Sequence, residues 1–529
     1  MALPILAGAI VLSSFLSEKR PHRFPYREAG LTERQAAAHL ISRFTYGATP
    51  GQVDEVIKMG LEKWFRQQLD ATLPDDSLQA MLDQYDALKL SNAQIAGTFP
   101  KNGQVIRMAI RDGYVDKDSV KTDRKAYRDI LKKYMDEKGY RPEQELFRQL
   151  YCQKILRAAY SQNQLKEVMT NFWFNHFNVS ITKNDCAEFI PAYERDVIRP
   201  GSLGRFADLL KATAHSPAML YYLDNFSSSG PVDSTRPMQK PRKAQGLNEN
   251  YARELMELHT LGVDGGYTQE DVTQAAKVLT GWTVRQGDFL FAPQRHDGSG
   301  KLVLGKRFGP DGGYEEGEQL LDMLAHHPST AHFISRKIAI RFVSDDPPAT
   351  LVNKMTKTFK DKDGDIREVL LTMVSAPEFW SSAAIREKTK SPFELAMGAV
   401  RSLRAHVNQP FQLYNWVTRM GEKMYFYQAP TGFPDKGQFW INTGSLLNRM
   451  NFGLALATGR IPGLSFDLAV LNNNHEPESA QAALETYCRI IMPERDLDQT
   501  IRRLTPMLTD PTEARVVGII IGSPEYQRR

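Results

Sequence analysis

The sequence predicts a mainly α-helical protein, with a multi-helix, bundle-like globular domain, one small β-hairpin and a small C-terminal helical part. Apolar residues recur at helical spacing in most segments, as in residues 53–69, and this spacing gives a helix one apolar face. Residues that favour helix starts, such as Asn248 and Thr268, precede two of these segments. Strand-forming residues gather in residues 288–308, where we expect a hairpin that turns near residues 297–300.

Composition places the chain among ordinary globular proteins. Its 529 residues are 42% hydrophobic and 24% charged, which is typical of a soluble domain. The net charge of +5 is small for this length, so we expect no nucleic-acid partner, because such binding uses a concentrated basic surface. Three cysteines without a CxxC spacing indicate neither a disulfide framework nor a zinc–thiolate site. We expect three buried thiols.

Three parts are expected along the chain. Residues 1–30 hold an apolar N-terminal segment that lacks the basic start of a secretory signal and is too short for a membrane span. A degenerate signal or anchor and a peptide that packs on the domain both stay open, and so does membrane association. Residues 31–460 are expected to form the main helical domain, and residues 461–529 a C-terminal helical extension packed on it.

The first half of the main domain alternates exposed and buried helices. Dense charge of both signs in residues 111–143 predicts a solvated helix with i,i+4 ion pairs. Residues 143–160 form an amphipathic helix, and the helix in residues 161–179 carries a polar stripe next to an aromatic face. The stripe consists of Glu167, Asn171, Asn175 and Asn178, and the aromatic face of Phe172, Trp173, His176 and Phe177. Polar groups beside so much aromatic surface need hydrogen-bond partners.

The stretch at residues 246–283 is where we expect the functional centre. Asn248 is a good N-cap for its first helix, and Thr268 with Asp271 forms a capping box for the second. At about 100° per residue, Glu254 and Glu257 share one helix face with Asn250 and Arg253, whereas His259 lies on the other. The preceding residues 226–246 are rich in Ser, Gly and Pro and carry basic residues, Arg242 and Lys243 among them.

Several segments together resemble the bacterial family catalogued as "domain of unknown function 1800". They are spread in the expected order over residues 31–459: SRFTYGATP (42–50), VMTNFWFNHFNV (168–179), ERDVIRPGSLGRFADLL (194–210), HSPAMLYYLDN (215–225), GLNENYARELMELHTLGVDGGYTQEDV (246–272), LTGW (279–282), RKIAIRFV (336–343) and PTGFPDKGQFWINTGSLLNRMNF (430–452). The resemblance implies a mostly helical protein, export to the periplasm or beyond, and a sulfatase- or phosphatase-like companion protein. The N-terminus departs from the exported pattern.

The first functional hypothesis is a metal-dependent enzyme with a carboxylate and histidine site between helices. Divalent metals bind carboxylates and imidazoles, and helical bundles build such sites from facing helices. Glu254, Glu257, His176 and His259 are the candidate catalytic residues. Glu254, Glu257 and His176 would bind a divalent metal ion. No HExxH pair lies on the key helix, so the sequence does not decide whether the protein is an enzyme.

The first alternative is a non-catalytic protein that binds an anion, a glycan or a partner. It would use the basic loop at residues 226–246 and the free N–H groups at the Asn248 helix start. The candidate ligand-binding residues are Asn171, Asn175, Asn248, Asn250, Arg253, Arg242 and Lys243. The second alternative is a purely structural network of buried polar groups, in which Glu254 pairs with an arginine such as Arg195 or Arg199.

Overall fold

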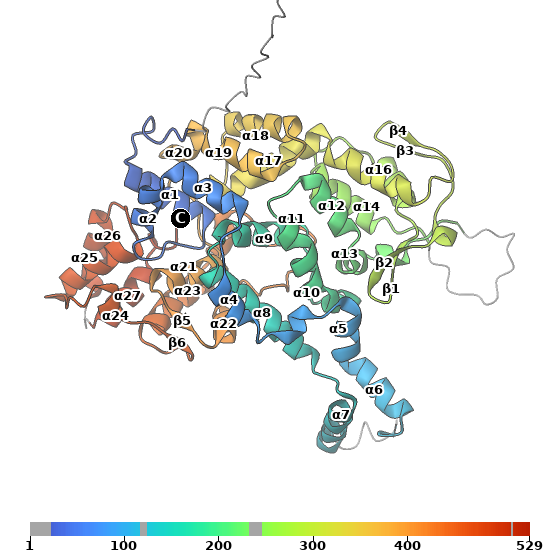
Figure 1. Cartoon of the computed structure of the whole chain (residues 1–529), viewed down its shortest axis with the longest axis horizontal. Coiled ribbons are helices and arrows are strands. Elements are labelled where there is room, and N and C mark those ends of the chain that lie inside the picture. Colours follow the sequence, from blue (N-terminus) through green and yellow to red (C-terminus); the bar gives the residue numbers. More distant parts are fainter. Residues whose placement is uncertain (1–22, 117–123, 232–245, 509–511) are drawn as a thin grey trace, which may run out of the picture.

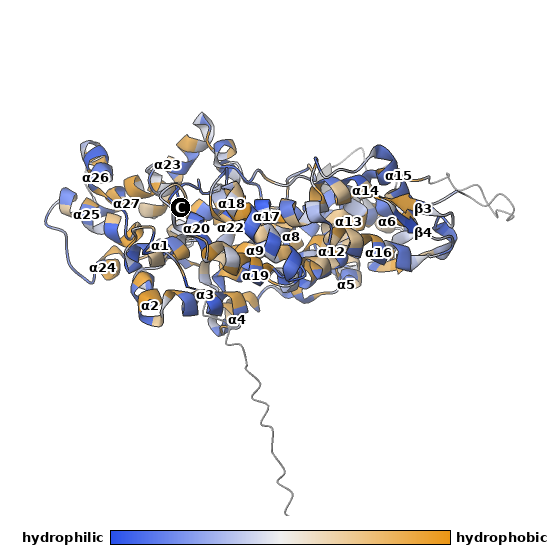
Figure 2. Ribbon diagram, turned by 90° about the horizontal axis from the view of Figure 1, so that it is seen from above, coloured by the Kyte–Doolittle hydropathy of each residue, from blue (hydrophilic) through white to orange (hydrophobic). Residues whose placement is uncertain are grey.

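Two buried helices form the centre of the molecule (Figure 1). Every residue of α21 (Pro392–Ser402) is buried, and α8 (Glu143–Tyr160) packs against it. The computed structural model describes residues 23–116, 124–231, 246–508 and 512–529. Helices surround this centre, and on most of them hydrophilic and hydrophobic residues are interleaved (Figure 2). The prediction of a mainly helical fold is therefore confirmed.

N-terminal and C-terminal helices lie side by side at one end of the molecule, blue and red in Figure 1. They are α1 (Glu33–Phe44), α2 (Gln52–Met59), α3 (Leu61–Asp70), α22 (Pro410–Arg419), α23 (Thr443–Ala457), α24 (Leu468–Leu471), α25 (Ala480–Ile491), α26 (Asp498–Leu504) and α27 (Glu513–Gly522). Helices α23 and α27 approach closely because glycines face each other: a Cβ on Gly453 would lie 2.8 Å from the Gly518 carbonyl oxygen. The C-terminal helices thus pack directly on the main domain.

The other end contains the middle of the chain, and a short arm projects from the body (Figure 1). The middle comprises α9 (Gln164–His176), α10 (Ile190–Ala192), α11 (Arg199–Gly201), α12 (Phe206–Ala214), α13 (Pro217–Tyr222), α14 (Asn250–Glu254), α15 (Gln269–Val278), α16 (Tyr314–Ala325), α17 (Pro328–Phe342), α18 (Ala349–Asp361) and α19 (Ile366–Val374). Helix α20 (Pro377–Trp380) lies beside α1 instead. The arm comprises α6 (Asn102–Arg111) and α7 (Arg124–Lys138), and α5 (Asn92–Thr98) leads into it. Helix α4 (Asp76–Leu82) packs on α8 in the body. Its own small apolar cluster forms around Val105, Ala109 and Tyr134.

The prediction of a single hairpin is wrong, because the strands pair differently in the structure. Two hairpins lie in succession, β1 (Trp282–Arg285) with β2 (Asp288–Phe291) and β3 (Lys301–Val303) with β4 (Lys306–Phe308). Each turns through two residues with positive φ, Gln286–Gly287 and Leu304–Gly305, a conformation that suits two-residue hairpins. Residues 297–300 connect them instead. A third short pair joins β5 (His406–Val407) to β6 (Leu464–Ser465).

Two π-helical turns interrupt the helices that carry the polar candidates. One is Tyr193–Ile198 and the other is Leu255–Thr260. Such turns are rare and are frequent at functional sites. The second directly continues α14, which begins at Asn250, one residue later than the Asn248 cap predicts. The capping box of Thr268 and Asp271 is confirmed.

Two further expectations concern the thiols and the membrane. Cys152, Cys186 and Cys488 are buried and free, as predicted, and burial raises the pKa of each thiol. Within the described ranges, no helix has both the length and the apolar character needed to cross a bilayer. The predictions for the apolar residues 2–16 and for Arg242 and Lys243 lie outside the described residues.

Candidate functional site

The two predicted carboxylates are neighbours on the surface of α14 and its π-helical turn. Glu254 and Glu257 are half-buried, and Tyr267 Oη donates a 3.4 Å hydrogen bond to Glu257. Burial, and then the charge of Glu257, raise the pKa of Glu254. Neither carboxylate pairs with Arg195 or Arg199: Arg195 binds Asp196, and Arg199 binds Glu167 and Glu194.

The two predicted histidines lie in the aromatic core, away from solvent. His176 Nε2 contacts the His259 carbonyl oxygen at 3.1 Å, and the two rings are 6.2 Å apart. His176 Nδ1 and His259 Nε2 are buried and have no hydrogen-bond partner among the described residues. Burial and the nearby charge of Lys337 lower the pKa of His259 to about 3, and burial likewise lowers that of His176. Both rings are therefore neutral at physiological pH.

The predicted metal set of Glu254, Glu257 and His176 gains no support from donor geometry. Among the residues that the structure describes, no group of three or more His, Cys, Asp or Glu side chains could hold a metal ion. The metal site therefore stays a prediction.

The predicted ligand-binding residues at the start of α14 bind other parts of the protein. Asn248 accepts a hydrogen bond from the Asn250 N–H at 2.9 Å. Arg253 binds Glu249 and Gln269 at 3.1 and 2.9 Å. These bonds fix the helix start in place, which is the role that the structural alternative assigns to it.

The polar stripe of α9 begins in a buried ion network. Arg199 donates to Glu167 at 2.5 Å and to Glu194 at 3.1 Å. Glu194 also accepts hydrogen bonds from Lys154 and Tyr425, at 3.1 and 2.7 Å. Although burial opposes the charge, these cations lower the pKa of Glu194 to about 2. The network joins α8, α9 and the first π-helical turn.

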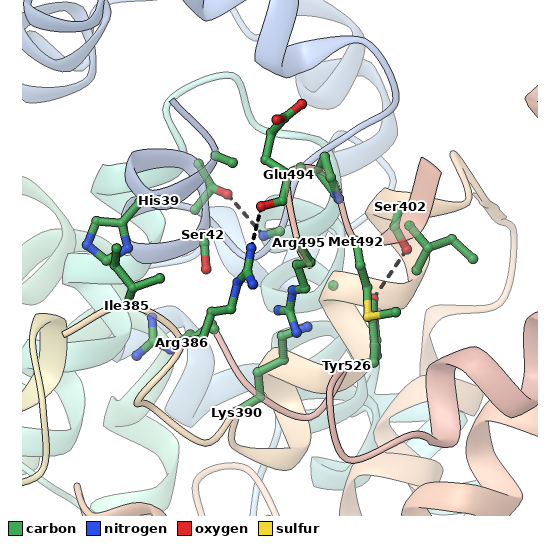
Figure 3. Close-up of a pocket in the computed structure, with 18 of the residues that line it drawn as sticks. His39, Ser42, Ile385, Arg386, Lys390, Ser402, Met492, Glu494, Arg495 and Tyr526 are labelled. Carbon is green, nitrogen blue, oxygen red and sulfur yellow. Dashed lines mark hydrogen bonds between the residues drawn. The ribbon is translucent and has the colours of Figure 1, made fainter. Parts of the chain in front are cut away.

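A cavity of about 170 Å³ lies between α1, α21, the end of α25 and the last residues of the chain. We call it the cationic cavity, and Figure 3 shows Arg386, Lys390 and Arg495 next to one another at its centre. Its polar lining consists of Gln35, His39, Ser42, Thr45, Tyr46, Arg386, Lys390, Glu394, Ser402, Glu494, Arg495, Tyr526 and Arg529. About 10–15 Å³ is enough for one water molecule, so this space is large enough for a small ligand.

Three cations of this cavity have no carboxylate partner among the described residues. Arg386 donates to the Glu494 carbonyl oxygen, and Arg495 donates to the carbonyl oxygens of Glu525 and Arg528. Lys390 is 8% exposed, and its Nζ contacts only the Tyr526 ring, at 3.7 Å from the centroid. Burial lowers the pKa of all three side chains, to about 10 for Arg495 and well below the ordinary range for Lys390.

The carboxylates of the cavity are already engaged. Glu394 pairs with Arg341 at 2.5 Å and with Arg529 at 3.1 Å, and these cations lower its pKa to about 2 against the effect of burial. Glu494 pairs with Arg34 at 2.8 Å. Behind the cavity, Arg529 donates to the carbonyl oxygen of buried Arg43, whose Nε and Nη1 have no hydrogen-bond partner within the described ranges. Positive charge is therefore in surplus around the cavity.

The start of α21 fixes the geometry of this charge cluster. Ser391 and Glu394 form a capping box, with Pro392 in the first turn, so the Glu394 carboxylate is held at the helix N-terminus. One turn later, Gly398 allows the backbone of Tyr46 to approach closely: a Cβ there would lie 3.1 Å from the Tyr46 carbonyl oxygen, whereas its distance of 3.7 Å from Lys390 Nζ would be an ordinary contact.

The cationic cavity was missed by reasoning from the sequence. Its charged residues are far apart in the chain, from His39 in α1 to Arg529, and each one alone is typical of a solvated surface. The signal that could have found part of it is the basic run at residues 386–390, REKTK, immediately before the Ser391 cap.

Comparison with known proteins gives a family and no activity. The family model described as "Protein of unknown function (DUF1800)" matches residues 39–528. This match continues past residue 460, where we expect the main domain to end. No curated protein and no solved structure matches the chain.

Proposed function

The chain belongs to the family described as "Protein of unknown function (DUF1800)", and from that premise we propose that it binds a small anionic ligand in the cationic cavity. The ligand would carry a carboxylate, phosphate or sulfate group. The single observation that supports this proposal is the surplus of buried positive charge around Arg386, Lys390 and Arg495.

Electrostatics explains why this surplus favours an anion. A buried charge without a partner costs several kcal/mol, and like charges in contact add to the cost. An anion that contacts Lys390 Nζ would supply the missing partner and restore the charged form of the amine. Arg386 and Arg495 have further donors in their guanidinium groups, and guanidinium groups bind carboxylate and phosphate well.

The proposal keeps the ligand chemistry of the first alternative from the sequence but places it elsewhere. The Asn248 helix start uses its polar side chains within the protein, whereas Lys390 Nζ has no hydrogen-bond partner in the described part of the chain. The metal-dependent enzyme remains a separate hypothesis, which elemental analysis of the purified protein tests directly.

Titration calorimetry with phosphate, sulfate and citrate tests anion binding. We expect saturable binding of at least one of them, weakened roughly tenfold in Arg386→Gln, which corresponds to about 1.4 kcal/mol. Arg404→Gln is the matched control, because Arg404 also has positive φ and donates to one backbone carbonyl, that of Pro50 at 2.7 Å, but does not line the cavity. Equal weakening in both variants, or no saturable binding, would refute the proposal.

A further inference from the structure

A second cavity of about 70 Å³ has the Glu394–Arg529 pair in its wall, as the cationic cavity does. We call it the carboxamide cavity, because Asn171 and Asn175 of α9 line it opposite Phe433 and Trp440. This volume is enough for several water molecules. Its residues overlap with the polar stripe that the sequence singles out.

Two of the three carboxamides in the stripe hold a loop in place. Asn175 Nδ2 donates to the Phe433 carbonyl oxygen at 2.9 Å, and its Oδ1 accepts from the Phe433 N–H at 2.7 Å. Asn178 donates to the carbonyl oxygens of Tyr427 and Ala429 at 3.1 and 2.8 Å. The loop lies so close that a Cβ on Gly432 would be 2.2 Å from the Asn175 carbonyl oxygen. These contacts fix the aromatic wall formed by Phe433 and Trp440, whose ring centroids are 5.7 Å apart.

The third carboxamide residue, Asn171, does not bind this loop. Asn171 lies one helical turn before Asn175 on the same face, is half-buried and lines the cavity. Its side chain makes no hydrogen bond with the part of the chain that the structure describes. A carboxamide can donate and accept at once, so Asn171 presents both kinds of group to the cavity.

Charge in the carboxamide cavity is balanced, in contrast to the cationic cavity. Its cations are paired: Lys154 with Glu194 at 3.1 Å, Arg341 and Arg529 with Glu394 at 2.5 and 3.1 Å, and Lys388 with Asp345. Glu422 has no cation partner among the described residues and accepts a 2.8 Å hydrogen bond from the Phe393 N–H. Burial raises the pKa of Glu422.

We propose that the carboxamide cavity binds a neutral, hydroxyl-bearing ring such as a sugar, with Asn171 and Glu422 as its polar contacts and Trp440 as its stacking surface. A pocket with an apolar wall and a few convergent polar groups is the usual form of a small-ligand site. Free carboxamide and carboxyl groups suit hydroxyls, and the balanced charge gives no preference for an anion. This site has different ligand chemistry from the proposed anion site and does not depend on it.

Titration with the methyl glycosides of glucose, galactose and N-acetylglucosamine tests this proposal. We expect at least one of them to bind saturably and to change the tryptophan fluorescence of the wild-type protein but not of Trp440→Phe. Asn171→Ala should weaken that binding at least tenfold at an unchanged melting temperature, because the side chain has no partner to lose. Glu422→Gln, which keeps an acceptor for the Phe393 N–H, should change the affinity without unfolding the protein.

Two control variants separate the alternatives. Asn175→Ala should lower the melting temperature as well as the affinity, because it releases the loop, and Arg386→Gln should bind the glycoside as the wild type does. Failure of every glycoside to bind, or wild-type affinity in Asn171→Ala, would overturn the proposal. Because the anion titration uses other ligands and other variants, either site can fail while the other stands.

Discussion

Lys390 shows how one side chain can be unfavourable for folding and suitable for binding. Its amine is buried beside Arg495 and Arg529, contacts the face of Tyr526, and has no hydrogen-bond partner in the described part of the chain. A cation over an aromatic ring gains roughly 1 kcal/mol, whereas a buried polar group without a hydrogen bond costs about 1–3 kcal/mol. Residues that lower the stability of the fold in this way are concentrated at functional sites, where stability and activity compete.

Lys390→Met should therefore stabilise the protein and abolish anion binding. The change removes the buried amine and keeps an unbranched side chain of similar length. We expect a gain of about 1–2 kcal/mol in the free energy of unfolding, since desolvation of the amine outweighs its contact with Tyr526. Urea denaturation without added anion measures the gain, and calorimetry measures the lost binding. A destabilised variant that still binds anions would contradict this account.

At the scale of elements, the π-helical turn Tyr193–Ile198 and α11 connect α9 to α8 through buried ions. Arg199, whose side chain is 12% exposed, joins Glu167 of α9 to Glu194 of the turn. Only six residues further along, Arg205 pairs with Asp363, and its side chain is 57% exposed. The two arginines belong to one stretch of chain and differ chiefly in burial.

Arg199→Leu should destabilise the protein far more than Arg205→Leu. Removal of Arg199 leaves two buried carboxylates short of a partner, which typically costs 3–5 kcal/mol. Loss of an exposed pair costs about 0–1 kcal/mol, because water screens it. Denaturation midpoints of the two variants measure the difference. Similar midpoints would show that the buried network adds nothing to stability.

At the scale of the whole molecule, three buried histidines make stability depend on pH. His39, His176 and His259 belong to different helices, and burial lowers the pKa of each, to about 3 for His39 and His259. In the unfolded chain these groups take up protons below pH about 6.5. The unfolded state therefore binds more protons than the folded state as the pH falls, and stability decreases in that range.

We expect the free energy of unfolding to fall by roughly 2 kcal/mol per buried histidine between pH 7.5 and pH 5, at about 1.4 kcal/mol per pH unit below 6.5. The buried carboxylates of Glu194 and Glu394 do not contribute there. The pKa values of Glu194 and Glu394 are lowered to about 2, so their stabilisation is lost only below about pH 4.5. His259→Leu should reduce this pH dependence of the free energy of unfolding by the contribution of one histidine. An unchanged slope in that variant would assign the acid sensitivity to other groups.

The local features of this protein can be predicted from its sequence. Periodicity and capping residues predict the helices around α8, α9 and α15, and the stripe of Asn171, Asn175 and Asn178 stands out because polar residues rarely share a helix with so many aromatics. The sequence predicts one hairpin where the structure has two. Each turn begins with a residue that does not favour positive φ, Gln286 or Leu304, so only the following glycine indicates the turn. The metal hypothesis combines Glu254 and Glu257, which share a helix face, with His176 of α9, and periodicity within one helix cannot predict whether side chains of two helices converge.

The sequence by itself determined the helical class, the family and the stripe that carries the carboxamide cavity, because these depend on residues within a few helical turns. Only the tertiary structure decided that Arg386, Lys390, Arg495 and Arg529 meet around one cavity and that their charge exceeds that of nearby carboxylates. Burial and charge balance depend on distances through space between segments hundreds of residues apart, and no local pattern records them.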